Sequence, residues 1–256
     1  MTDAPDSTDF GLIQGNIEFK DLSFGYVPDQ LVLKNLNLKI EVGQSIALVG
    51  ATGEGKTTIA SLIARFYEPT HGQVLIDGED YSKKTLHSLR SQLGVVLQTP
   101  HLFKGSIFDN IRYGKPAATK EEVLNALEAV GSLAEFKDRL DEEIGEEGGS
   151  LSMGEQQLLS FARAVLVNPR IFIMDEATSS IDTITEAKIQ QTIATMLKGR
   201  TSIIIAHRLS TIRHCDRILV IEKGQIIEDG SHEQLFEEKG KYYALYTKQL
   251  KTLSEL

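Results

Sequence analysis

The chain has 256 residues, of which 41% are hydrophobic and 25% are charged, and its formal net charge is −9. This length and composition indicate a soluble globular protein with a sizeable core and exclude a disordered or fibrous chain. The negative charge disfavours a broad surface for nucleic acid or anionic lipid, so no nucleic-acid partner is expected. Cys215 is the single cysteine, which excludes an intrachain disulfide. No apolar run approaches the roughly 20 residues of a membrane-spanning helix, and the acidic, polar start does not resemble a signal peptide.

The N-terminal part begins with a polar stretch and continues with predicted strands. Residues 1–14 are rich in Asp, Thr, Ser and Pro and predict a linker. From residue 15 apolar residues alternate with polar ones, which predicts short strands separated by turns. The segment that follows predicts an amphipathic helix, because its apolar residues recur at helical spacing. These apolar residues are Ile59, Leu62, Ile63 and Phe66.

The middle of the chain differs in character from both ends. Residues from about 100 to 160 contain helix-forming stretches and an acidic, glycine-rich segment, and they predict a helical subdomain inserted into the main domain. Strands and helices then alternate toward the C-terminus, which indicates parallel β–α–β units with right-handed crossovers. The main domain is expected at residues 15–250, with a short tail at 251–256.

A phosphate-binding loop is predicted between the third strand and the helix. Residues 50–57 read GATGEGKT and fit the pattern G-x-x-x-x-G-K-[ST]. Glycines let backbone N–H groups surround a phosphate, and the helix N-terminus adds a positive dipole. Lys56 is expected to place its charge on the β- and γ-phosphates, and Thr57 to ligate Mg²⁺. The loop residues expected to bind nucleotide are Gly50, Ala51, Thr52, Gly53, Glu54, Gly55, Lys56, Thr57 and Thr58.

Two carboxylates follow a second apolar strand. Residues 171–176 read IFIMDE, which places Asp175 and Glu176 at the C-terminal edge of a buried strand, where ligands bind in open α/β sheets. Asp175 is expected to hold Mg²⁺, and Glu176 to polarise the attacking water. Together with the loop, these residues predict a P-loop NTPase. The chain contains no N-K-x-D motif, which argues against a small GTPase.

Residues 151–157 read LSMGEQQ, which resembles the signature motif L-S-G-G-Q of ATP-binding cassette (ABC) ATPases. The motif stands between the phosphate loop and the acidic strand, as in that family, and the resemblance extends over residues 16–246. It implies ATP as the nucleotide and Mg²⁺ as the metal. It also implies an α/β fold with a RecA-like P-loop NTPase core, an N-terminal antiparallel β subdomain and an inserted α-helical subdomain.

The resemblance implies further site residues. Tyr26 matches the aromatic residue that stacks on adenine, and Gln98 matches the glutamine that contacts Mg²⁺ and water beside the transmembrane partner. Asp182 ends the segment SSID, which looks like the D-loop, and His207 matches the histidine that contacts the γ-phosphate. Each of these residues also has a plain structural interpretation, such as a strand-edge aromatic or a core histidine. The implied catalytic residues are Glu176, His207, Gln98 and Lys56.

Several stretches resemble the exporter branch of the family, among them LFKGSIFDNIRYG, DEATSSIDTITE and IIIAHRLSTI. An exporter implies transmembrane domains as partners and a location at the cytoplasmic face of the cell membrane. It also implies a second nucleotide-binding domain, bound head to tail around ATP. In that arrangement Ser152 and Gly154 contact the γ-phosphate held by the partner.

The signature departs from the family pattern at Met153 and Glu155. A methionine obstructs the close backbone approach that glycine allows, and a carboxylate repels phosphate. Ser152-x-x-Glu155 also forms a capping-box pattern, which stabilises the start of a helix. A weakened signature beside otherwise intact catalytic residues favours a heterodimer with a different subunit, and a homodimer that tolerates LSMGE is the alternative.

Glu54 stands where the family usually has a small residue. Its carboxylate either repels phosphate or points outward without effect, and we expect it to point outward. Two functions of other classes remain open at this stage. One is a soluble ABC ATPase that acts in DNA repair or translation, and the other is a catalytically idle, ATP-binding regulatory module.

Overall fold

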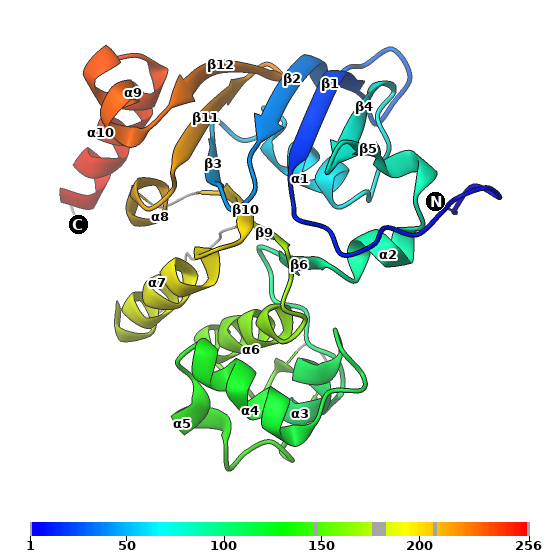
Figure 1. The fold of residues 1–256 in the computed structure, drawn as a ribbon. Helices are drawn as coiled ribbons and strands as arrows, with labels where there is room; N and C mark the ends of the chain where they lie inside the picture. The colour runs from blue at the N-terminus through cyan, green and yellow to red at the C-terminus, as the bar shows by residue number, and fades with distance from the viewer. Residues whose placement is uncertain (1, 146–147, 176–182, 207–208, 255–256) are drawn as a thin grey trace.

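A computed structural model describes residues 2–145, 148–175, 183–206 and 209–254. Its larger strands form two sheets, and helices from the middle of the chain form a separate lobe beside them (Figure 1). One hydrophobic core lies between the antiparallel sheet and one face of the central sheet, and the other lies between the opposite face and the helices. The structure therefore confirms the predicted α/β class, with its antiparallel β subdomain and inserted helical subdomain.

The antiparallel sheet has the strand order β2-β1-β4-β5. Its strands are β1 (Ile17–Phe24), β2 (Leu33–Ile40), β4 (His71–Ile76) and β5 (Glu79–Asp80). The buried residues of β2 include Leu36, Leu38 and Ile40, with exposed Asn37 and Lys39 between them. This alternation produces one face that packs on the core and one that faces solvent.

The central sheet has the order β12-β11-β3-β10-β9-β6. Its strands are β3 (Ser45–Val49), β6 (Leu93–Val96), β9 (Ile171–Asp175), β10 (Thr201–Ile205), β11 (Arg217–Glu222) and β12 (Gln225–Gly230). All neighbouring strands are parallel except β11 and β12, which form a hairpin. Every residue of β3 and β10 is buried, because packed layers cover both faces of the sheet.

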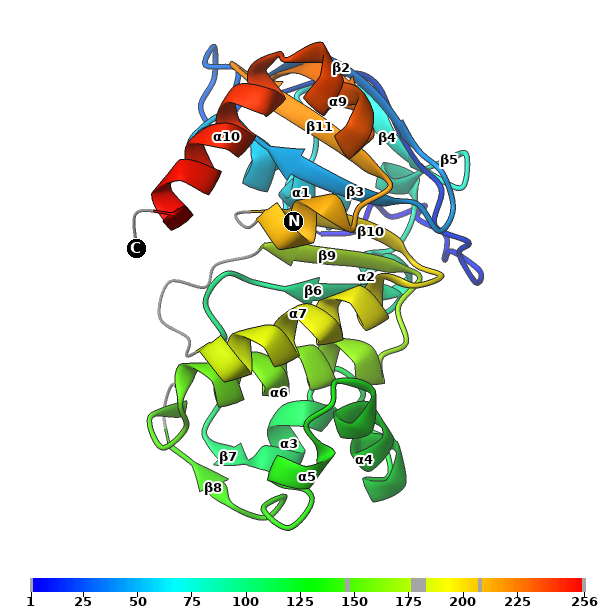
Figure 2. The same ribbon diagram turned by 90° about the vertical axis from the view of Figure 1, so that its left-hand side faces the viewer.

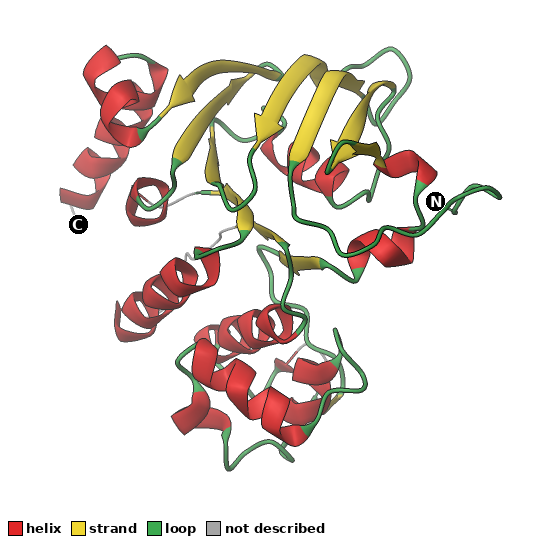
Figure 3. Cartoon of the chain, viewed as in Figure 1, coloured by secondary structure: helices red, strands yellow, loops and turns green. Residues whose placement is uncertain are grey.

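Helices fall into two groups (Figure 3). The helical lobe contains α3 (Ile107–Arg112), α4 (Lys120–Ala129), α5 (Leu133–Phe136), α6 (Met153–Leu166) and the antiparallel pair of β7 (Gly105–Ser106) and β8 (Glu143–Ile144). The rest are α1 (Lys56–Ile63), α2 (Leu86–Arg90), α7 (Thr183–Leu197), α8 (Leu209–Arg213), α9 (His232–Glu238), α10 (Lys241–Ser254) and the 3₁₀ turn η1 (Tyr81–Lys83). In Figure 2, α7 lies between the central strands and α6. Among the described residues, no helix combines the length and apolar character needed to cross a membrane.

The helix after the phosphate loop is shorter than its apolar periodicity predicts. Helix α1 ends at Ile63, and Arg65 takes a left-handed backbone conformation with φ of 50°. Phe66 consequently leaves the apolar face and is 45% exposed, so its predicted place on that face is wrong. The predicted core positions Ile59, Leu62 and Ile63 are all buried.

The polar segment before β1 lies against the domain. Phe10 and Ile13 are buried in the core between the two sheets. Their backbone N–H groups donate hydrogen bonds to Ser88 Oγ and Gln92 Oε1, each at 2.9 Å. Two apolar side chains therefore fix a segment whose overall composition is that of a linker.

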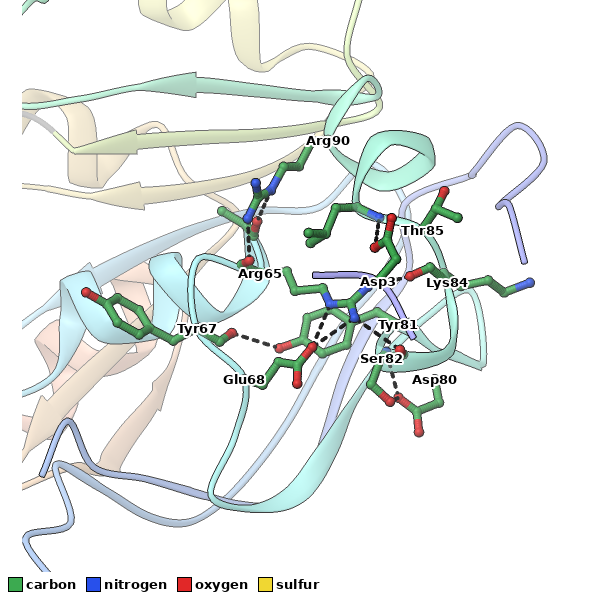
Figure 4. A network of polar contacts seen from close by, with 12 residues as sticks. Asp3, Arg65, Tyr67, Glu68, Asp80, Tyr81, Ser82, Lys84, Thr85 and Arg90 are labelled. Atoms are coloured by element: carbon green, nitrogen blue, oxygen red, sulfur yellow. Dashed lines mark hydrogen bonds and ion pairs between the residues drawn. The ribbon is translucent and has the colours of Figure 1, made fainter. Parts of the chain in front are cut away.

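Arg65 anchors the end of α1 to the antiparallel subdomain (Figure 4). Its guanidinium is 1% exposed and lies 5.4 Å from the centre of the Tyr81 ring. It donates to Glu68 Oε1 at 2.8 Å and to the carbonyl oxygens of Ser82 at 3.0 Å and Lys84 at 2.5 Å. This network links the residue after α1 to Glu68, before β4, and to the backbone between η1 and α2.

We expect Arg65→Met to lower the free energy of unfolding by about 2–4 kcal/mol, because it removes a buried guanidinium that donates to two part-buried carbonyl oxygens and to Glu68. Urea denaturation measures this change. Arg112→Met is the matched control, since Arg112 is exposed and contacts Asp109 and the Phe108 ring of its own helix, and it should cost less than about 1 kcal/mol. Equal losses in the two variants would contradict this account of Arg65.

Candidate nucleotide-binding site

A cavity of about 320 Å³ lies at the C-terminal edge of the central sheet. The phosphate loop after β3 forms one side of it, while Gln98 follows β6 and Asp175 ends β9. The residues that line the cavity are Tyr26, Val32, Thr52, Gly53, Gly55, Lys56, Thr57, Thr58, Gln98, Asp175 and Ile205. The structure thus brings together nine residues that the sequence predicted for the site.

Two glycines shape the phosphate loop. At Gly50 the backbone has φ of 154°, and a Cβ would lie 2.3 Å from the carbonyl oxygen of Ile221. At Gly55 φ is 106°, and a Cβ would lie 2.7 Å from Leu33 Cδ2. The close backbone approach at Gly50 leaves no room for a side chain, and the positive φ at Gly55 favours glycine at the other end of the loop.

Lys56 begins α1 and is buried beneath the loop. Its Nζ donates to the carbonyl oxygens of Gly50 at 2.9 Å and Ala51 at 2.8 Å. Burial lowers the pKa of Lys56, while the nearby carboxylates of Asp175 and Glu54 oppose this change. The ammonium group is thus held inside the loop, within reach of any phosphate that the loop surrounds.

Side-chain oxygen atoms that could ligate a metal ion lie beside Lys56. Thr57 Oγ1 lies 3.5 Å from Asp175 Oδ2, and Gln98 lines the same cavity. A hydroxyl, a carboxylate and an amide oxygen are the hard donors that Mg²⁺ prefers, with phosphate oxygens and water completing its shell. The residues present therefore fit the predicted metal.

Tyr26 lies at the open end of the cavity. Its hydroxyl is 3.0 Å from Thr58 Oγ1, and its ring meets those of Phe24 and Tyr67 edge to face, with centroids 4.9 and 5.1 Å apart. These contacts fix the ring, which is still 50% exposed. A fixed, exposed aromatic face is suited to stacking on a base.

The signature residues lie away from this cavity, at the start of α6. Ser152 is the N-cap: its Oγ accepts from the Glu155 backbone N–H at 3.3 Å, and Glu155 Oε2 accepts from the Ser152 N–H at 2.9 Å. The structure therefore confirms the predicted capping box. Gly154 is buried, whereas Met153 is 45% exposed at the helix start.

Arg139 is a signature contact that the sequence analysis missed. Its Nη1 lies 2.7 Å from Glu155 Oε1, and its Nε lies 2.7 Å from Glu142 Oε2. Although burial acts to raise the pKa of Glu155, hydrogen bonds from Arg139 and Ser152 lower it overall. A turn between α5 and β8 brings Arg139 and Glu142 together, and no sequence pattern relates Arg139 to Glu155.

Three predicted site residues, Glu176, Asp182 and His207, lie outside the described residues.

The fold and the site define an α/β domain of the P-loop NTPase class. The family model described as ABC transporter matches residues 33–179, which is more than half of the chain. The chain belongs to the ABC transporter family. The predicted resemblance to ABC ATPases is thereby confirmed.

Relatives and a solved structure agree with this membership. The chain is 49% identical over 239 residues to the ABC transporter ATP-binding protein YfiC of Bacillus subtilis, covering 92% of this chain and 39% of YfiC. It is 44% identical to an ATP-dependent lipid A-core flippase of Syntrophus aciditrophicus, and the match covers 98% of this chain and 42% of the flippase. The structure of a bacterial Atm1-family ABC exporter with ATP bound superposes with a TM-score of 0.90 at 39% identity. The match covers 97% of this chain and 44% of the exporter chain. The chain thus spans about two fifths of the length of these proteins.

We expect the contribution of Glu155 to stability to depend on pH. Because its pKa is lower in the folded state, the contribution is present above the pKa of the unfolded chain, roughly 4.3, and is lost as pH falls through the folded-state pKa. Glu155→Gln should therefore cost about 1 kcal/mol at pH 7 and progressively less between pH 5 and pH 3. Urea unfolding at several pH values, with exposed Glu237→Gln as control, measures this. A cost that does not change with pH would contradict it.

Proposed function

We propose that the chain binds Mg-ATP and hydrolyses it, and thereby powers export through transmembrane partner domains at the cytoplasmic face of a membrane. The observation that supports this most is the single cavity in which Lys56, Thr57, Gln98 and Asp175 meet beside an exposed tyrosine ring. The names of two relatives, a lipid A-core flippase and a probable multidrug resistance transporter, support export over a soluble ABC ATPase or an idle module. They differ in substrate, so no substrate is proposed.

In this proposal the loop N–H groups and Lys56 bind the phosphates, and Tyr26 stacks on adenine. Mg²⁺, held by Thr57, Asp175 and Gln98, would neutralise phosphate charge. Glu176 orients or deprotonates the attacking water, and Lys56 and His207 stabilise the charge that develops in the transition state.

ATP joins two domains head to tail in the proposed dimer. Each loop binds the phosphates from one side, and the signature of the partner, through Ser152 and Gly154, contacts the γ-phosphate from the other. Binding therefore favours the closed dimer, and hydrolysis loosens it. Gln98 and the segment 141–149 transmit this change to the transmembrane domains.

We propose a heterodimer in preference to a homodimer. The signature carries Met153 at the exposed start of α6, where the family pattern has glycine and phosphate must come close. The charge of Glu155 is balanced by Arg139, so the bulk of Met153 is the stronger obstacle. Pairing with a subunit whose signature is intact would complete the site that contains this chain's own loop and Glu176.

Glu176→Gln should leave ATP binding in place but reduce turnover by about 100-fold or more, because the side chain can no longer accept the proton of water. The variant should also accumulate as an ATP-bound dimer. Phosphate release, ATP titration and light scattering measure these properties, with Glu237→Gln as the control. Turnover like that of the unchanged chain would contradict the role of Glu176.

If the signature limits the chain on its own, restoring it should raise activity without a partner. We expect Met153→Gly combined with Glu155→Gln to increase ATP turnover of the isolated chain by about tenfold. Glu155→Gln alone should have little effect, since Arg139 already balances its charge. A full exporter-like rate in the unchanged chain, with no gain in the double variant, would contradict the heterodimer.

A further inference from the structure

Glu54 belongs to the phosphate loop, but its side chain turns away from the cavity. Gly53 and Gly55 on either side of it line the cavity, whereas Glu54 does not. Its Oε2 instead accepts a hydrogen bond from the backbone N–H of Lys223, in the turn between β11 and β12. The carboxylate therefore joins the loop to a hairpin on a distant part of the chain.

The turn that donates this hydrogen bond is firmly placed. Lys223 and Gly224 have φ of 50° and 76°, the successive left-handed conformations of a tight hairpin turn. The Gly224 carbonyl accepts from the Lys34 N–H at 3.1 Å, and a Cβ at Gly224 would lie 1.9 Å from the Val32 carbonyl oxygen. Glu54 is thus bonded to backbone that is packed against the start of β2.

The middle of the loop has little other support on this side. Ala51, Thr52 and Gly53 are exposed, and a Cβ at Gly53 would find no atom within 4 Å. Lys56 holds the Gly50 and Ala51 carbonyls at the first half of the loop. Glu54 supplies a further tie, next to the exposed middle of the loop.

Nearby cations reduce the cost of a carboxylate so close to a phosphate site. The charge of Glu54 acts to raise the pKa of Lys56, against the effect of burial. It also helps to raise the pKa of Lys241, where the hydrogen bond to Glu222, at 2.8 Å, is the larger cause. The carboxylate therefore lies in the field of two lysines, Lys56 and Lys241.

We propose that Glu54 is a positioning residue for nucleotide binding, whose carboxylate holds the phosphate loop against the β11–β12 turn in the shape that accepts phosphates. The inference rests on the proposed binding of ATP. It reverses the expectation from charge alone, in which a carboxylate in the loop weakens binding. A small residue at this position cannot reach Lys223 and leaves the middle of the loop without this hydrogen bond.

The test measures binding of Mg²⁺ with a non-hydrolysable ATP analogue to the full chain by calorimetry. Glu54→Ser removes the acceptor and should weaken binding about five- to tenfold. Glu54→Gln retains an oxygen that accepts from Lys223 and should restore most of the affinity despite the lost charge. Glu121→Ser, an exposed change of the same kind on α4, is the matched control.

Two further readouts separate positioning from general destabilisation. Glu54→Ser should speed hydrogen–deuterium exchange at the Lys223 amide, and it should raise the KM for ATP with kcat little changed. Tighter binding in both Glu54→Ser and Glu54→Gln would overturn the proposal in favour of charge repulsion, and affinities within twofold of the unchanged chain would overturn it as well. If the unchanged chain binds no ATP analogue, the proposed function fails instead.

Discussion

The close approach of two backbones at Gly50 is the constraint on which the site depends. There the chain leaves β3 so near the carbonyl of Ile221 in β11 that no side chain fits between them. A second contact of this kind joins Gly224, at the end of the same strand, to the carbonyl of Val32 before β2. These contacts fix the phosphate loop and the antiparallel sheet to one hairpin, and the hairpin belongs to the central sheet. The loop is therefore placed by backbone packing before any ligand contributes.

The parallel strands of the central sheet determine which side chains lie near the phosphate loop. Strands β3, β9 and β6 end at the same edge, so Lys56, Asp175 and Gln98 meet there although they are far apart in sequence. Tyr26 follows β1 of the antiparallel sheet, and its hydroxyl is hydrogen-bonded to Thr58 of α1. The cavity is consequently a product of the contact between the two sheets, and neither sheet alone would form it.

Most of the site features that the sequence predicted correctly are defined by local patterns. The phosphate loop and the capping box at Ser152 depend on residues within a few positions of one another, so their spacing is enough to identify them. The end of α1 was misjudged because periodicity continues through Phe66, whereas the left-handed Arg65 is fixed by carbonyls of η1 and its neighbour. The pairing of Arg139 with Glu155 likewise depends on how two segments pack, and helical spacing carries no information about it.

In the proposed function a domain of net charge −9 binds a polyanion, and the carboxylates of the phosphate loop, of β9 and of the signature show how the two are compatible. Glu54 is bonded to the Lys223 N–H, Glu155 to Arg139, and Asp175 lies beside the Thr57 hydroxyl. Glu54 and Glu155 are thus bonded to donors of the protein, and Asp175 is the carboxylate that faces the cavity, where it fits Mg²⁺. The positive potential that remains comes from Lys56 and from the backbone N–H groups of the loop. Because these groups are held by packing, the site can attract phosphate locally while the surface as a whole stays acidic.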